Sequence, residues 1–293
     1  MYPTISSPLG KTALYVCACR AYETKNRPLF EVLFNDPFAE KLAGEYGFAF
    51  LKVMAESIEY DMPLEAKVKI FADIFSVRTA YIDKVLQHAL EADKSEQIVI
   101  FAVGGDCRPF RMSFPQNCKI FEFDLPEVIL YRSTILKELG AKCPCQLISL
   151  GCDLTKPEIW IKKLKENGFD ASKKTFFLLE GLLMYLKNEE IEALLKNISG
   201  LCTEGSIIVG DVMSDEYLTS ETNKKFLDLW NIWGSPIVST CSNPEKLIDK
   251  LGFVCKVNTF GDVDTNFGRF PNYPKHRLEE GSVRILYFSG IKK

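Results

Sequence analysis

The sequence predicts an α/β protein in which a doubly wound, Rossmann-like sheet follows a helical N-terminal segment. Three observations predict this fold. Residues 1–95 have the apolar spacing of helices rather than that of strands. From Gln97 onward, short apolar runs alternate with helical stretches. The first of these runs, at 98–103, is apolar throughout, which is typical of a parallel strand buried on both faces.

Composition narrows the possible partners and the class of protein. The chain has 293 residues, of which 47% are hydrophobic and 26% charged, as in globular proteins that bury a full core. A net charge of −3 argues against nucleic acid or an anionic membrane as the main partner, because both need a clustered basic excess. No segment approaches the ~20 apolar residues of a membrane span, and the first residues do not resemble an export signal. We therefore expect a cytoplasmic protein.

Cysteine and histidine usage limits the chemistry. Without an export signal, the ten cysteines are expected to be reduced thiols. The close pairs Cys17 with Cys19 and Cys143 with Cys145 have C-x-C spacing and no neighbouring histidine, so we expect no metal site. The chain has 2 histidines, and neither lies in a nucleophile motif, which argues against a Ser-His-Asp or Cys-His mechanism.

The N-terminal part is expected to form a helical cap or lid over residues 1–95, with the sheet domain over 96–293 as part of one compact unit. A first helix is predicted around 12–22. Asp36 followed by Pro37 has the pattern of an N-cap and a first helical residue. Pro63 begins a long helix that keeps its apolar spacing to Leu86.

Strands and helices then alternate to the end of the chain. Strands are expected at 98–103, 119–123, 146–150, 175–179, 206–209, 253–257 and 282–288. Helices are expected at 126–139, 157–166, 188–201 and 244–251, with a helix-rich stretch before Trp233 and a polar loop at 261–280. In such sheets, ligands bind beyond the carboxyl ends of the strands. The residues that follow each strand are therefore the candidates for a site.

The first two strand ends suit a ligand that contains ribose. Gly104 and Gly105 follow the first strand and allow the backbone to approach a ligand closely. The dinucleotide pattern G-x-G-x-x-G is incomplete, because Ala102 and Cys107 occupy its first and last positions, which argues against a pyrophosphate. Asp124 ends the second strand at the ~20-residue spacing of a carboxylate that binds ribose hydroxyls. The alternative is that Asp124 only caps the next helix.

The next two strand ends also carry acidic residues. Asp153 can accept a hydrogen bond from an exocyclic amine such as that of adenine, while the backbone N–H of Leu154 donates to a ring nitrogen; the alternative is an aspartate that caps the following helix. Glu180 lies in an apolar stretch, where a charge is costly unless it is paired or faces a polar ligand. This favours a functional role for Glu180.

Upstream, Arg78 interrupts an apolar helix. An arginine can bind a carboxylate through two hydrogen bonds, and the alternative is a salt bridge to Asp73 or Asp83 on the same helix. One acid for a ribose, one for a base, and an acid with an arginine for a zwitterion together describe a site for adenosine with an amino-acid tail. S-adenosylmethionine has this structure.

The chain resembles the leucine carboxyl methyltransferase-like family over nearly its whole length. That family includes protein phosphatase methyltransferases, wybutosine-type tRNA enzymes and bacterial polyketide O-methyltransferases related to the tetracenomycin enzyme. The similar motifs lie at 12–23, at 26–28, at 36–39, at 76–78 with Ile82 and Asp83, in the glycine-rich loop at 104–112, at 121–128 and at 180–186. The chain departs from the family pattern at Ala102, where a glycine is usual, and at Gly105, where a leucine is usual.

The resemblance implies a seven-stranded methyltransferase sheet whose last strand is antiparallel, and S-adenosylmethionine as the cofactor. It also implies a role for each matching residue: Arg78 at the methionine carboxylate, Gly104 at the close backbone approach, Asp124 at the ribose, Asp153 and Leu154 at adenine, Glu180 at the methionine ammonium group, and Tyr185 as the catalytic residue facing the methyl acceptor.

The acceptor implied by the family is a carboxylate, either on a small molecule or at a peptide C-terminus. A carboxylate is already ionised at neutral pH, so its O-methylation needs alignment rather than a strong base, which fits the scarcity of histidine. Candidates for holding an anionic acceptor are Arg20, Arg27, Arg269 and Arg277, and the alternative for each is an exposed, solvated charge. Two other functions are possible for this sheet, namely a nicotinamide-dependent oxidoreductase and an inactive cofactor-binding module.

Overall fold

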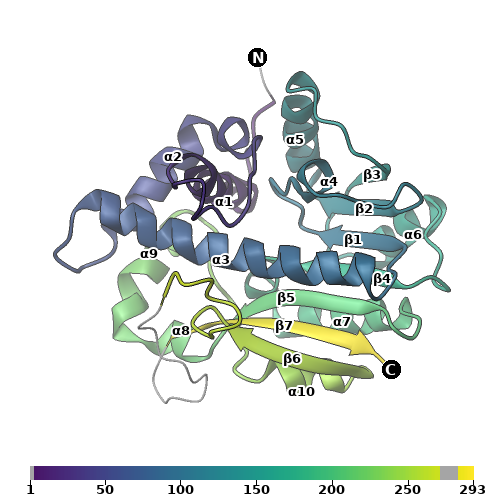
Figure 1. Cartoon of the computed structure of the whole chain (residues 1–293). Helices are drawn as coiled ribbons and strands as arrows, with labels where there is room; N and C mark the ends of the chain where they lie inside the picture. Colours follow the sequence, from purple (N-terminus) through teal and green to yellow (C-terminus); the bar gives the residue numbers. More distant parts are fainter. Residues whose placement is uncertain (1–2, 271–282) are drawn as a thin grey trace.

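The computed structural model describes residues 3–270 and 283–293. Within them the chain forms a seven-stranded sheet in the order β3-β2-β1-β4-β5-β7-β6 (Figure 1). The strands are β1 (Gln97–Phe101), β2 (Lys119–Asp124), β3 (Gln146–Gly151), β4 (Thr175–Leu179), β5 (Ile207–Met213), β6 (Phe253–Thr259) and β7 (Ile285–Lys292). Strands β1 to β5 are parallel, and β7 runs antiparallel to both β5 and β6. The predicted fold and its antiparallel last strand are confirmed.

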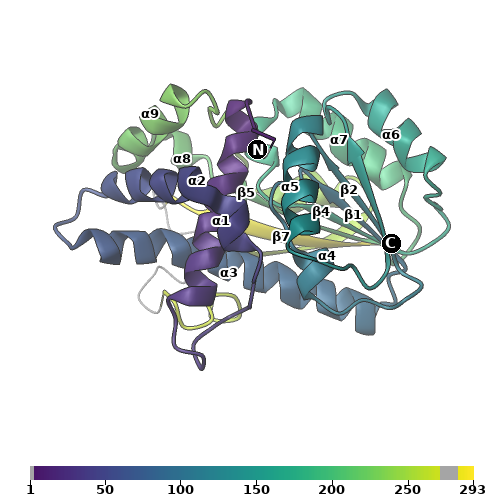
Figure 2. The same cartoon turned by 90° about the horizontal axis from the view of Figure 1, so that it is seen from above.

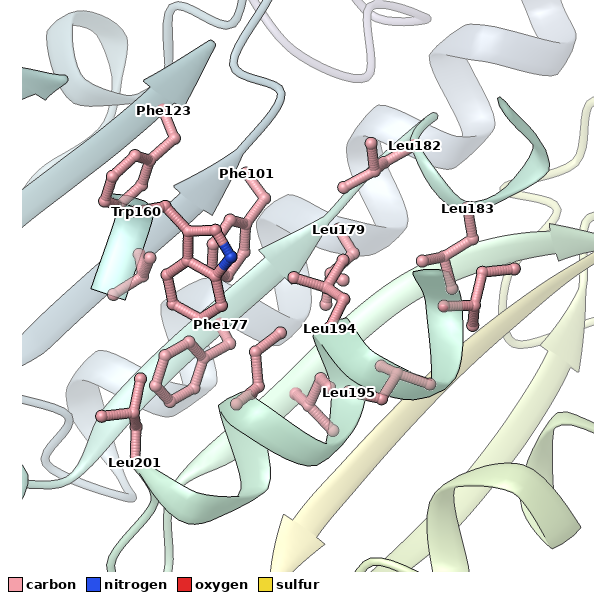
Figure 3. Packing of buried hydrophobic residues seen from close by; sticks show 14 of the residues in the cluster. Phe101, Phe123, Trp160, Phe177, Leu179, Leu182, Leu183, Leu194, Leu195 and Leu201 are labelled. Carbon is pink, nitrogen blue, oxygen red and sulfur yellow. The ribbon is translucent and has the colours of Figure 1, made fainter. Parts of the chain in front are cut away.

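The sheet core is built from aromatic and branched residues of the central strands. All five residues of β1 are buried, as the apolar run predicts. The rings of Phe101 and Phe123 stack with their centroids 5.6 Å apart, and the indole of Trp160 packs edge-on against Phe101 at 5.2 Å (Figure 3). Leu194 and Leu195 extend this cluster under the sheet (Figure 3). This core holds the central parallel strands side by side, so that their carboxyl ends lie along the same edge of the sheet.

Helices cover both faces of the sheet. The long helix α3 (Leu64–Glu91) lies across one face, and α6 (Pro157–Glu166), α7 (Asn188–Gly200) and α10 (Pro244–Asp249) lie across the other (Figures 1 and 2). The remaining helical elements are α1 (Pro8–Lys25), α2 (Ala39–Glu56), α4 (Arg108–Arg111), α5 (Pro126–Glu138), η1 (Leu183–Tyr185), α8 (Glu216–Thr219), η2 (Glu221–Asn223) and α9 (Lys224–Ile232). Helices α1, α2, α8 and α9 gather at the carboxyl ends of the parallel strands (Figure 1).

Two local predictions are corrected by the structure. Asp36 does not cap α2, which begins at Ala39; its carboxylate accepts a hydrogen bond from Phe38 N at 3.2 Å and pairs with Arg20 Nε at 3.0 Å. A buried arginine needs a counter-charge, and this outweighs the local capping pattern. The last strand reaches Lys292 rather than 288, because its final residues pair with the start of β5.

Among the described helices, none is both long enough and apolar enough to cross a membrane. The loop expected at 261–280 lies partly outside the described residues. Its described part makes a chain of tight turns, in which Thr265 N donates to Asp262 O at 2.9 Å and Arg269 N donates to Asn266 O at 2.8 Å. The division into a cap at 1–95 and a sheet domain at 96–293 stays a prediction.

Candidate functional site

A cavity of about 770 Å³ opens at the carboxyl ends of β1, β2 and β4. Helices α1, α3 and α9 contribute to its walls. Sites that hold a drug-sized ligand usually measure about 300–1,000 Å³, so this cavity has room for a cofactor and a second small molecule. Five of the predicted site residues line it, namely Arg78, Gly104, Asp124, Glu180 and Tyr185.

The other two predicted residues do not line the cavity. Asp153 follows β3 and is exposed, and its carboxylate accepts hydrogen bonds from the backbone N–H of Thr155 at 2.9 Å and from its hydroxyl at 2.7 Å. Leu154 is partly buried against the sheet core. The structure thus places these two residues beside the strand ends, and their contact with adenine stays a prediction.

The turn after β1 has the conformation that a glycine-rich loop requires. Gly104 has φ of +50° and Ala102 has φ of +52°, both in the left-handed region. Alanine rarely adopts this region, so the turn holds Ala102 in a left-handed conformation at the expense of local strain. The departure from the family pattern at Ala102 therefore leaves the turn intact.

Asp124 connects this turn to the end of β2. One carboxylate oxygen accepts from Gly104 N at 2.6 Å and the other from Leu125 N at 2.7 Å. No side chain caps α5, so the capping alternative does not describe Asp124. Burial raises the pKa of the Asp124 carboxyl to about 6, although the two N–H groups act in the opposite direction.

Gly105 allows helix α1 to pack against the turn. A Cβ atom at this position would lie 2.0 Å from Cys17 Sγ, so a side chain cannot fit there without movement. Arg20 of the same helix donates to the carbonyl oxygen of Gly105 and pairs with Asp36. Arg20 is thus buried and tied to the protein's own groups, which contradicts its reading as an exposed charge.

A charged network lies at the ends of β4 and β5, and we define it as Arg78, Arg108, Glu180 and Asp211. Arg78 donates from Nε to Glu180 Oε1 at 2.9 Å and from Nη1 to Asp211 Oδ2 at 3.1 Å. Arg108 donates from Nη1 to Glu180 Oε2 at 2.6 Å. Arg78 therefore pairs with Glu180 and Asp211. The alternative of a surface salt bridge to Asp73 or Asp83 is wrong.

The two acids of the network differ in their ionisation. Burial opposes the charge on Glu180, but the guanidinium groups of Arg108 and Arg78 outweigh it and lower the pKa of Glu180 below its ordinary value. Burial raises the pKa of Asp211, and Arg78 only partly offsets it. Asp211 Oδ1 also accepts from Gly181 N at 2.6 Å, which fixes the chain just after Glu180.

Sequence reasoning missed two members of the network. Asp211 is a carboxylate inside the apolar run of β5, and the argument applied to Glu180 would have identified it. Arg108 lies in the glycine-rich motif, but nothing local indicates that it reaches Asp83 at 2.6 Å and Glu180, which lies 72 residues away in the chain.

Aromatic side chains line the cavity as well. We call seven of them the aromatic cluster: Tyr15, Phe71, Phe75, Tyr185, Tyr217, Phe226 and Trp230. Tyr15 packs edge-on against Phe75 with centroids 5.0 Å apart, and Tyr185 against Trp230 at 6.1 Å. Burial raises the pKa of Tyr15, Tyr185 and Tyr217, so their hydroxyls stay protonated at neutral pH.

The remaining arginine candidates are not in the cavity. Arg27 pairs with Asp73, and Arg269 pairs with Glu23 at 2.8 Å and with Asp73 at 3.4 Å. Both side chains are nearly buried, so they are neither solvated charges nor part of the cavity wall. Arg277 lies outside the described residues. In the described part of the chain, no group of three or more His, Cys, Asp or Glu side chains is arranged to hold a metal ion.

Sequence comparisons connect the chain with methyltransferases. The model of the leucine carboxyl methyltransferase family matches residues 13–199. A protein of Mycolicibacterium paratuberculosis, provisionally named an S-adenosyl-L-methionine-dependent methyltransferase, is 34% identical over 216 residues, which cover 71% of this chain. A Mycobacterium ulcerans protein of the same name is 34% identical over 222 residues, covering 73% of this chain and 68% of that protein. The chain spans 66% of the length of the first relative, or about two thirds.

Solved structures share the fold at low sequence identity. A DUF574 family protein from Streptomyces avermitilis superposes with a TM-score of 0.59 at 8% identity, covering 94% of this chain and 97% of that one. A protein from Thermobifida fusca, provisionally named a methyltransferase, superposes with a TM-score of 0.55 at 16% identity, covering 99% and 100%. These two structures therefore share the overall fold of this chain.

Proposed function

Because this chain belongs to the leucine carboxyl methyltransferase family, we propose that it transfers a methyl group from S-adenosylmethionine to an oxygen atom, and that this oxygen belongs to a carboxylate. The observation that carries the proposal is that Arg78, Glu180, Asp124 and Gly104, drawn from α3 and three strand ends, all face one cavity. This is the set of charges that complements an adenosine with an amino-acid tail.

The residues present fit the cofactor. Nε and Nη1 of Arg78 are used within the charged network, whereas in the described part of the chain no hydrogen bond uses Nη2, which leaves a donor for a carboxylate. Glu180 is held ionised and suits an ammonium group. Asp124 lines the cavity, and its carboxylate suits ribose hydroxyls, with Gly104 supplying the close backbone approach. Asp153 and Leu154 are proposed at the adenine.

Methyl transfer to a carboxylate does not require a general base, because the acceptor oxygen is already ionised at neutral pH. The bound cofactor supplies a methyl group on a positively charged sulfur. The acceptor oxygen gains the methyl carbon as the carbon–sulfur bond breaks and its electron pair stays on sulfur, so no proton moves. The chain then has to align the two molecules and exclude water. We propose that Tyr185, at the border between charged and aromatic walls, orients the acceptor.

The alternative of a nicotinamide-dependent oxidoreductase predicts a different ligand. The incomplete glycine pattern and the acids after β2 and β4 favour the methyl donor over a pyrophosphate. An inactive module would bind the same cofactor without turnover.

The test of the proposed reaction is the chemical behaviour of the product. The full chain is incubated with radiolabelled S-adenosylmethionine and a panel of carboxylic acids, and the product is exposed to mild base. A carboxyl methyl ester releases labelled methanol under these conditions, as the proposal expects. A labelled product that survives mild base would be an ether or an N-methyl group and would contradict the carboxylate acceptor.

A further inference from the structure

Two thiols lie in contact just before strand β3. Cys143 and Cys145 precede this strand, and their Sγ atoms are 3.6 Å apart. Both side chains are partly exposed, and the residues beside them, Lys142, Pro144 and Gln146, are exposed. The two cysteines therefore form a close pair at the surface of the protein.

The backbone between the two cysteines brings their side chains together. In a straight strand, residues two positions apart lie on the same face of the sheet but roughly 6.6 Å from each other. Here the chain bends at Pro144 and Cys145. The proline ring fixes its own φ, so the bend has little freedom to open. The pairing of the thiols is therefore a property of the folded backbone.

The other close pair in the sequence has the same spacing but a different geometry. Cys17 and Cys19 lie within helix α1, where residues two positions apart do not face each other. Both are fully buried, and Cys17 Sγ accepts a hydrogen bond from Arg20 Nη2 at 3.3 Å. The sequence spacing C-x-C thus describes two different situations, and only the pair before β3 brings two thiols together at the surface.

A third thiol lies beside this pair but is buried. Cys118 precedes β2 directly, as Cys145 precedes β3, and the first residues of these two strands are partners in the sheet. A hydrogen bond with Cys118 raises the pKa of Cys145 to about 11, although Cys143 acts in the opposite direction. The hydrogen bond to Cys145, and then burial, raise the pKa of Cys143 further. Cys145 is therefore the first thiol of the pair to ionise, and Cys118, 1% exposed, is shielded from solvent.

We propose that Cys143 and Cys145 form a site of reversible oxidation, at which a small organic disulfide converts the two thiols to one intrachain disulfide. The Cys145 thiolate attacks one sulfur of the reagent and releases the other sulfur as a thiol. Cys143 then attacks the Cys145 sulfur of this mixed disulfide and expels the second reagent thiol. Two electrons and two protons pass from the pair to the reagent, which is reduced to two thiols.

The geometry favours the second step over a lasting mixed disulfide. The sulfur atoms must approach from 3.6 Å to a bond length of about 2.0 Å, which rotation of the side chains can supply. The loop that the bond closes has one intervening residue, so the disulfide adds little stability by restricting the unfolded chain. Exposed disulfides of this kind are easily reduced. The site therefore returns to two thiols when reduced thiols are in excess.

This site is separate from the proposed methyltransferase site. The cavity opens at the carboxyl ends of the strands, whereas Cys143 and Cys145 lie at the amino end of β3 and do not line it. The inference goes beyond the proposed function, and its test needs neither S-adenosylmethionine nor a methyl acceptor. A failure of one proposal is therefore distinguishable from a failure of the other.

The experiment incubates the full folded chain with oxidised glutathione at mildly alkaline pH, alkylates the remaining thiols and maps the products by peptide fragmentation and mass spectrometry. We expect a Cys143–Cys145 disulfide that forms at least about tenfold faster than glutathione attaches to Cys202. Dithiothreitol should restore both thiols. Cys202 is the matched comparison, because it is also partly exposed and its thiol donates to the carbonyl oxygen of Ile198 at 3.2 Å.

Two variants test the order of the steps. Cys143→Ser removes the second thiol, so Cys145 should retain one glutathione. Cys202→Ser should leave the yield of the Cys143–Cys145 disulfide unchanged. The inference is wrong if the wild-type chain keeps glutathione on Cys145, if the pair reacts no faster than Cys202, or if Cys145 becomes joined to Cys118. A disulfide that forms in urea but not in the folded chain would also contradict it, because the folded backbone would then not be what pairs the thiols.

Discussion

The charged network and the aromatic cluster share one cavity but are built in different ways. In the network, Arg78 and Arg108 hold Glu180 through hydrogen bonds of 2.9 and 2.6 Å, and Asp211 fixes both Arg78 and the backbone of Gly181. The cluster is held by edge-on and stacked ring contacts at 5.0–6.3 Å between centroids, which are much less directional than hydrogen bonds. We call the network the rigid half, which suits the proposed cofactor, and the aromatic cluster the adaptable half, which suits the proposed acceptor.

The largest expected effect breaks the rigid half. Arg78→Met leaves Asp211 buried without its guanidinium and removes one of the two that hold Glu180, so the free energy of unfolding should fall by about 3–5 kcal/mol, measured by urea denaturation. Calorimetry should then show no binding of S-adenosylmethionine. If this variant does not fold, Arg78→Lys keeps the charge but loses the fork, and its cofactor affinity should still fall at least about tenfold.

The matched control for Arg78 is an exposed ion pair. Lys162 and Glu166 on α6 lie 3.8 Å apart with both side chains in solvent, and Lys162→Met should change the free energy of unfolding by less than about 0.5 kcal/mol. A similar small change in Arg78→Met would mean that the charged network contributes nothing to the fold.

The next effect breaks the adaptable half. Trp230 contacts Tyr15, Phe50, Tyr185, Phe226 and Trp233, so Trp230→Ala should lower the free energy of unfolding by about 3 kcal/mol, at the lower end of the range for a buried aromatic residue because one side faces a cavity. Acceptor binding should be lost, while the dissociation constant for S-adenosylmethionine stays within about twofold. A loss of cofactor binding as large as that of acceptor binding would show that the two halves are not independent.

The smallest expected effect is a pH dependence of stability and of cofactor affinity, which arises from Asp124 on the cofactor side of the cavity. Asp124 has a folded pKa of about 6, above its ordinary value of 3.8, so the folded chain holds more protons between these values and its stability falls as pH rises through that window. Ribose hydroxyls donate to the charged carboxylate, so cofactor affinity should change in the opposite direction. Between pH 5 and pH 7 the affinity should rise about tenfold, as the ionised fraction does.

The control for this titration is Asp124→Asn. The variant lacks the titrating group, so its weaker affinity should be flat between pH 5 and pH 7 when measured by calorimetry. A pH dependence that persists in Asp124→Asn would assign the titration to another group.

Sequence reasoning reached the charged half better than the aromatic half. The rule that ligands bind beyond the strand ends identified Gly104, Asp124 and Glu180, because each follows a strand that is recognisable from its own residues. Arg78 was found because a charge interrupts an apolar helix. Its partner Glu180 lies 102 residues away, and only the fold brings the two together.

Apart from Tyr185, which the family resemblance implied, the aromatic cluster was not predicted, because its residues have the pattern of an ordinary buried core. Phe71 and Phe75 lie one helical turn apart on α3, and such spacing predicts a buried helix face as readily as a cavity wall. The prediction that Asp36 caps a helix was wrong for a similar reason. Its partner Arg20 lies on another helix, and the local sequence does not show that contact. Local sequence patterns predict individual helices and strands. A cavity forms where several of these elements leave space between them, and no local pattern reports that.

The central claim is that the acids and the arginine at the strand ends recognise S-adenosylmethionine. Its most direct test is a calorimetric titration of the full chain and of Asp124→Ala with S-adenosylmethionine, NAD⁺ and NADH. We predict one site for S-adenosylmethionine per chain, weakened at least about tenfold by Asp124→Ala, and no binding of either nicotinamide. Binding of NAD⁺ or NADH in its place, or S-adenosylmethionine affinity that Asp124→Ala leaves unchanged, would contradict the account.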